Sequence, residues 1–311
     1  MRKLLVSLRE HVSTDFHPGL YGTVAVFLAV TIAANYRFDF EDSVIDAYRG
    51  REIRMLWYFL LYGVAYYFTV LAQAWFGQVG TALRQRRFWL LSLAGMGMLA
   101  VDGGFYYHRW VADRLFAAEV QPYAVKCLGQ LNSLLTILLP CALLYRWSGH
   151  RPESFYGLTT RGVNLRPYAG MLLGMVPLVA WASFQPDFLL TYPSYQPTAA
   201  DPYLATPPWV NALGFELAYG WDFVATELLF RGLLVIGLAQ VLGNRAVLPM
   251  TVTYAFLHFG KPLGETIGSV FGGYILGVIA LYSRNIWGGV ALHLGVAWLM
   301  ELAAFLQLPF R

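Results

Sequence analysis

The sequence predicts an all-α protein, a polytopic membrane helix bundle with about eight or nine spans. Of its 311 residues, 58% are hydrophobic and only 13% are charged, whereas soluble domains carry about 25% charged residues. Several apolar runs reach the roughly 20 residues that a helix needs to cross a bilayer. The predicted spans are 19–36, 55–76, 88–107, 128–146, 167–185, 209–241, 246–259, 266–283 and 286–306.

The N-terminal stretch "MRKLLVSLREHVSTDFHPG" lacks the long apolar core and the small-residue cleavage site of a signal peptide. It is predicted to be a short amphipathic segment at the membrane surface. Basic residues gather in "RQRR" at 84–87, whereas the loop 186–208 has no Lys or Arg. By the positive-inside rule we expect an integral membrane protein with a cytoplasmic N-terminus, in a bacterial inner membrane.

Two later segments have unusual lengths. Residues 209–241 are too long for one straight crossing, which predicts a tilted or kinked helix or one that lies partly outside the lipid. Residues 246–259 are short, which predicts a half-span or a helix buried by its neighbours. A loop with six prolines, "FQPDFLLTYPSYQPTAADPYLATPPW", divides the chain. We expect membrane spans of unassigned role in 1–200 and a functional core in 209–306.

Other common site types have little support in the sequence. The net charge of +4 comes from scattered loops and forms no nucleic-acid patch. Cys127 and Cys141 have neither disulfide nor zinc-site spacing, so two packed or idle thiols are expected.

Polar residues concentrate in the first span after this loop. Glu227 and Arg231 are four residues apart, the acid-before-base spacing of a helical ion pair. Tyr219, Asp222 and Thr226 form a neighbouring stripe at helical spacing. A charge at the bilayer centre costs about 2.5 to 3.5 kcal/mol on insertion scales, so such groups face a bundle interior or a wet cavity. An ion pair that only orients the helix is the structural alternative.

The next spans add further ionisable groups. His258 lies in "VTYAFLHFG", and His293 and Glu301 lie in the last span. A single His in an apolar helix is more often a hydrogen-bonded core residue than a catalyst. Ionisable groups on three consecutive spans instead predict one shared polar site. Between the histidines, "GSVFG" and "GYILG" are small-xxx-small patterns that allow close helix packing.

These residues together resemble the family of CAAX-prenyl proteases and bacteriocin-processing enzymes (CPBP), which are glutamate-dependent intramembrane endopeptidases. The family signature is E-E-x-x-x-R, then F-x-x-x-H, then H-x-x-x-N on three helices. "TELLFRG" aligns with the first motif and gives Glu227 and Arg231. "YAFLH" and "HLGVA" align with the other two and give His258 and His293, with Tyr254 in place of Phe. The resemblance covers about residues 209–306.

Two positions depart from the family pattern. Thr226 replaces the first Glu, which the family uses with its first His to activate water. Ala297 replaces the Asn that helps to hold the oxyanion. A Thr hydroxyl cannot serve as general base in place of a carboxylate, so the resemblance leaves Asp222 or Glu227 for that role.

The sequence therefore predicts an intramembrane endopeptidase-like protein that cleaves membrane-associated or lipidated peptides in the bilayer without a cofactor. The expected catalytic residues are Glu227, Arg231, His258, His293 and Asp222. The expected substrate-binding residues are Tyr219, Thr226 and Glu301. The main alternative is an inactive family member that acts as a scaffold or binds peptides or lipid tails. Zinc held by the histidines and one acid and a proton-coupled transporter are lesser alternatives.

Overall fold

The computed structural model describes residues 2–147 and 154–307, and all regular structure in those ranges is helical. The α-helices are α1 (Arg2–Asp15), α2 (Pro18–Phe38), α3 (Ile53–Trp75), α4 (Arg86–Gly104), α5 (Tyr107–Leu115), α6 (Gln121–Leu131), α7 (Leu139–Trp147), α8 (Arg166–Ala182), α9 (Phe188–Thr191), α10 (Ala200–Tyr203), α11 (Pro208–Glu227), α12 (Ala239–Leu242), α13 (Val247–Phe256), α14 (Leu263–Ser283) and α15 (Trp287–Gln307). The π-helical segments are η1 (Glu41–Ile45), η4 (Leu134–Leu138) and η5 (Leu228–Gly237), and the 3₁₀ segments are η2 (Asp46–Tyr48), η3 (Ala82–Arg84) and η6 (Gly243–Ala246). The predicted all-α helix bundle is confirmed.

Every predicted span is helical, but the number of separate crossings is smaller than the number of apolar runs. Six helical stretches of the described residues are long and apolar enough to cross a membrane, or up to seven if the bent pair α4–α5 forms one span. The expectation of eight or nine is roughly compatible with this number. α8 has only 17 residues, and 208–256 is a single run of 49 helical residues. The chain is an integral membrane protein.

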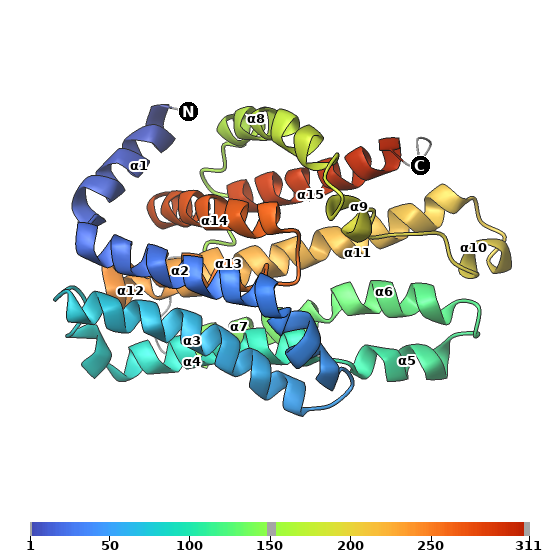
Figure 1. The fold of residues 1–311 in the computed structure, drawn as a ribbon, viewed down its shortest axis with the longest axis horizontal. Coiled ribbons are helices and arrows are strands. Elements are labelled where there is room, and N and C mark those ends of the chain that lie inside the picture. The colour runs from blue at the N-terminus through green and yellow to red at the C-terminus, as the bar shows by residue number, and fades with distance from the viewer. Residues whose placement is uncertain (1, 148–153, 308–311) are drawn as a thin grey trace.

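The short helix α13 lies at the centre of the bundle. It packs against α3 on one side and α14 on the other, and all ten of its residues are buried. Figure 1 shows it enclosed by these longer helices. Of the two predicted interpretations of 246–259, the structure shows a helix buried by its neighbours.

The long segment before α13 changes its hydrogen bonding part-way. α11 leads directly into η5, whose ten residues are all buried. The chain turns at Gly243, where φ is +61°, a conformation that glycine adopts without steric cost. α15 packs along α8, and α11 packs along α6. These two helices of the C-terminal core therefore contact helices that come earlier in the chain (Figure 1).

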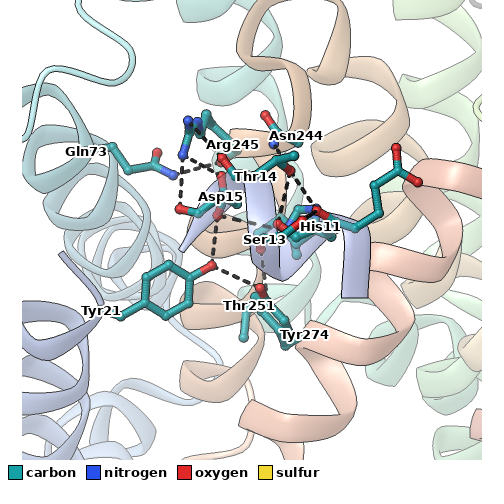
Figure 2. Close-up of polar contacts among 12 residues, drawn as sticks. His11, Ser13, Thr14, Asp15, Tyr21, Gln73, Asn244, Arg245, Thr251 and Tyr274 are labelled. Carbon is teal, nitrogen blue, oxygen red and sulfur yellow. Dashed lines mark hydrogen bonds and ion pairs between the residues drawn. The ribbon is translucent and has the colours of Figure 1, made fainter. Parts of the chain in front are cut away.

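The helix α1 is docked by its polar face. His11 and Asp15 are fully buried, and Asp15 accepts hydrogen bonds from Arg245 at 2.8 Å and from Tyr21 at 2.8 Å. Figure 2 shows this network, in which the hydroxyls of Tyr21 and Tyr274 are also 2.9 Å apart. The exposed apolar side chains of α1 are Leu5, Val6 and Val12. This outward apolar face suits the predicted contact with a membrane surface.

Cys127 and Cys141 are free thiols. The sulfur of Cys141 lies 3.6 Å from that of Met98 in the core, so this thiol is packed as predicted.

Candidate active site

The centre of the site is a fully buried ion pair at the junction of α11 and η5. Nη1 of Arg231 lies 2.9 Å from Oε1 of Glu227, and their side chains are 1% and 0% exposed. The guanidinium also stands over the ring of Tyr254, 4.2 Å from its centroid. The buried charge of Arg231 is therefore balanced by the carboxylate and by the aromatic face of Tyr254.

His293 of α15 extends this pair into a chain of three groups. Its Nδ1 is 3.2 Å from Oε1 of Glu227, and its Nε2 is 3.1 Å from the hydroxyl of Tyr254. A carboxylate only accepts hydrogen bonds, so Nδ1 carries the proton. In the neutral ring Nε2 is then the acceptor, and Tyr254 donates to it. The result is a carboxylate–imidazole–phenol relay inside the bundle.

Two glycines let these groups approach each other. A Cβ at Gly289, one turn before His293, would lie 2.3 Å from Oε2 of Glu227. A Cβ at Gly273 of α14 would lie 2.9 Å from the ring of Tyr254. The small-xxx-small patterns predicted from the sequence thus include one glycine that gives the phenol its place.

His258 lies on the other side of Tyr254, in the turn after α13. Its Nδ1 is 2.8 Å from the backbone carbonyl of Tyr254, which makes Nδ1 the donor and leaves Nε2 as the basic nitrogen. The two rings meet edge to face with centroids 4.6 Å apart, and the rings of Tyr254 and His293 are 5.9 Å apart. The structure therefore brings Glu227, Arg231 and both histidines around one tyrosine.

The match to known proteins falls on this part of the chain. Residues 207–299 match the family described as Type II CAAX prenyl endopeptidase Rce1-like. This segment belongs to the Rce1-like family. Neither the curated proteins nor the solved structures include a match to the chain. The Rce1-like segment contains the ion pair, the tyrosine and both histidines, and it leaves residues 1–206 without an assigned family.

The remaining predicted catalytic residue, Asp222, lies on a different side of α11. Its carboxyl hydrogen-bonds to Ser133, and Asp102 of α4 and Lys261 are charged groups near it. Asp102 in turn accepts a hydrogen bond from Thr136. The hydrogen bond of Asp222 is thus with a residue before the Rce1-like segment rather than with the relay.

Two of the predicted substrate-binding residues, Tyr219 and Thr226, lie on α11. Tyr219 is part of an aromatic row on α11, with ring centroids 5.7 Å from Phe215 and 4.8 Å from Phe223. Phe223 meets the ring of His293 at 4.5 Å, so this row runs along α11 from the buried Phe215 to the relay. Thr226 is half-buried directly before Glu227.

Glu301 has a contact that the sequence did not predict. It is buried two turns beyond His293, and its two carboxylate oxygens each lie 3.0 Å from the backbone nitrogen of Ser194. The side chain fixes the loop between α9 and α10 over the end of α15. It is outside the Rce1-like match, which ends at residue 299.

Tyr254 is the residue of the site that sequence reasoning missed. In the motif it is a Tyr in place of Phe. Its hydroxyl indicates a nearby polar partner, because a buried phenol usually makes a hydrogen bond.

Within 2–147 and 154–307, the acids Glu41, Asp42 and Asp46 are the one group of three side chains spaced for a metal ion. Asp46 in this group is bonded to Arg49 and Arg54.

Proposed function

We propose that the chain is an intramembrane endopeptidase of the Rce1-like type that hydrolyses peptide bonds of membrane-associated or lipidated substrates. The observation that supports this proposal is the Glu227–His293–Tyr254 relay, with the ring of His258 packed edge to face against the same tyrosine. In a membrane protein, buried ionisable groups that converge from three helices are interpreted by default as a functional site.

In the proposed reaction, Nε2 of His258 takes a proton from water, and the hydroxide attacks the peptide carbonyl. Glu227, a member of the relay, and Asp222 are the two candidate carboxylates for assisting the water. The protonated His258 then gives its proton to the leaving amine as the C–N bond breaks. One water is consumed, and one acid and one amine are formed.

The oxyanion of the tetrahedral intermediate needs donors that are already in place. We assign oxyanion stabilisation to His293, which Glu227 holds at Nδ1, together with the Tyr254 hydroxyl 3.1 Å from its Nε2. Ala297, at the position of the family's Asn, has only a methyl group. Arg231 supplies the counter-charge to Glu227 at 2.9 Å.

The aromatic row on α11 suits a substrate with an apolar portion, because aromatic rings supply large apolar area beside polar tips. A peptide with a lipidated Cys would reach the relay from the bilayer along this row. We place the protein in a bacterial inner membrane with a cytoplasmic N-terminus. Reporter fusions at residue 85 and at residue 195 test that orientation, because the proposal puts the first inside and the second outside.

The test of the enzymatic proposal is turnover by purified protein in liposomes with a fluorescent farnesylated peptide. The variants are Asp222→Asn, Glu227→Gln, His258→Ala and His293→Ala. We expect losses of about 100-fold or more for His258 and His293. The matched control is His108→Ala, which removes an imidazole bonded to Asn132 outside the site. Wild-type turnover in all four variants would eliminate the enzyme.

A second function is favoured by two residues of the site. Thr226 and Ala297 lack the carboxylate and the amide of the family motifs, so a protein that binds lipidated peptides without cleaving them is the alternative. For such a protein, the labelled peptide binds the wild type and is recovered intact. The His258→Ala change then alters only the unfolding midpoint.

A further inference from the structure

The turn that carries His258 is tied to α13 by backbone hydrogen bonds and to other helices by side chains. α13 ends at Phe256, and the N–H groups of Leu257, His258 and Phe259 donate to the carbonyls of Thr253, Ala255 and Phe256. Residues 257–262 then connect α13 to α14. Carbonyl lone pairs of this turn that its own backbone leaves free need hydrogen-bond donors from elsewhere. One of them comes from α14, because the Thr266 hydroxyl donates to the carbonyl of His258.

The other partners come from the far end of the sequence. The amide nitrogen of Asn35 donates to the carbonyl of Phe259 at 2.9 Å. The Tyr36 hydroxyl lies 2.6 Å from the carbonyl of Lys261 and 2.7 Å from the Thr266 hydroxyl. Each hydroxyl has its own proton, so Tyr36 can donate to the Lys261 carbonyl while Thr266 donates to the His258 carbonyl. The last turn of α2 thus holds two carbonyls of this turn, one and three residues after His258.

Asn35 is itself fixed. It is 5% exposed, and its amide oxygen accepts the backbone N–H of Glu41 at 3.1 Å. Because the oxygen and the nitrogen of the planar amide are both hydrogen-bonded, any rotation of the amide would break at least one of these bonds.

The segment after α2 closes the turn from a third direction. A Cβ at Gly260 would lie 2.6 Å from Oε2 of Glu41. The other oxygen of Glu41 accepts a hydrogen bond from Tyr58 at 2.7 Å. The carboxylate is therefore held in place, and the turn has no room to move towards it.

We propose that Asn35 and Tyr36 are positioning residues for His258, so that α2, outside the Rce1-like segment, takes part in building the site. This inference rests on the proposed function for its kinetic consequences. The ring of His258 is bonded at Nδ1 to the Tyr254 carbonyl of α13, and the backbone directly after His258 is held by Asn35 and Tyr36. The two anchors together set the direction of the ring. A displacement of about 1 Å at a reacting group can lower a rate about 100-fold.

The experiment combines kinetics with a direct view of the imidazole. The variants are Asn35→Leu and Tyr36→Phe, and the control is Thr31→Val, which removes a hydroxyl bonded only within α2. With the farnesylated peptide in liposomes, we expect kcat to fall about 10-fold or more in both variants, with KM within about two-fold and the control unchanged.

The second readout is ¹⁵N NMR of histidine-labelled protein, with the His258 signals assigned from His258→Ala. In the wild type the Nδ1 proton of His258 is hydrogen-bonded, so the ring has a single tautomer. We expect both tautomers in Asn35→Leu and Tyr36→Phe. Tyr36 is partly exposed, so its variant remains informative even if the buried Asn35 variant does not fold.

The outcomes separate the two proposals. Unchanged His258 signals in Tyr36→Phe and folded Asn35→Leu would overturn the positioning role, whatever the kinetics. If the wild type does not cleave the peptide, the endopeptidase proposal fails, but altered His258 signals in the two variants would still establish that α2 orients this ring.

Discussion

Breaking the ion pair between Glu227 and Arg231 should destabilise the protein strongly, and breaking it on both sides should not. Arg231→Met leaves the Glu227 carboxylate buried at 0% exposure. Loss of one partner of a buried pair costs about 3 to 5 kcal/mol. His293 still contacts that carboxylate at 3.2 Å, so we expect the lower end, about 3 kcal/mol.

The reverse change leaves a cation without a counter-ion. In Glu227→Gln the guanidinium retains only the face of Tyr254, 4.2 Å away, and a desolvated cation–π contact is worth about 2 kcal/mol. We therefore expect about 3 to 4 kcal/mol of destabilisation. The double variant removes both charges and fills similar volume, so it should lose less than either single variant.

The assay is denaturant unfolding in mixed micelles, with all four proteins of the double-mutant cycle in one detergent. Arg109→Met, at an exposed arginine, is the control and should change stability by less than about 0.5 kcal/mol. The reasoning is wrong if each single variant loses under about 1 kcal/mol, or if the two losses simply add in the double variant.

Three further changes test other contacts. Gly289→Ala forces a methyl against Glu227 and should cost about 1 to 3 kcal/mol in unfolding assays, whereas Gly268→Ala, which meets nothing within 4 Å, should be neutral or slightly stabilising. Tyr254→Phe removes the donor to the site imidazole and should cost about 1 kcal/mol and lower kcat about 10-fold or more; full turnover would remove the phenol from the mechanism. Burial lowers the pKa of His11 below its ordinary 6.5, so the unfolded state binds the proton first and stability falls as pH drops through about 6.5. The unfolding midpoint of His11→Phe should lack this component of the pH profile.

The apolar pattern predicted the helices well because the residues that make a segment apolar lie within that segment. Runs of about 20 apolar residues have no other stable state in lipid, and all nine predicted segments are helical. The count of crossings was harder to predict, since a local pattern does not show that α11 continues through η5 or that α13 is too short to cross alone.

The site was predicted where its residues are close in sequence. Glu227 and Arg231 are four apart, and that spacing alone sets their contact. The bond from Asn35 joins residues 224 positions apart, and no periodicity in either segment encodes it. The position of Tyr254 in the second motif could be read from the sequence, but its hydrogen-bond partner, His293 on α15, could not.

The π-helical stretch η5 makes the geometry of the site depend on chain length. Its backbone bonds reach one residue further than those of an α-helix, and such stretches often mark functional sites. Removing a single residue after Arg231 would restore ordinary winding and rotate the preceding helix by about 100°. Glu227 would then turn away from α15 although Glu227, His293 and Tyr254 were all kept. Among related proteins, one inserted or deleted residue here could therefore switch the catalytic geometry on or off more completely than most substitutions.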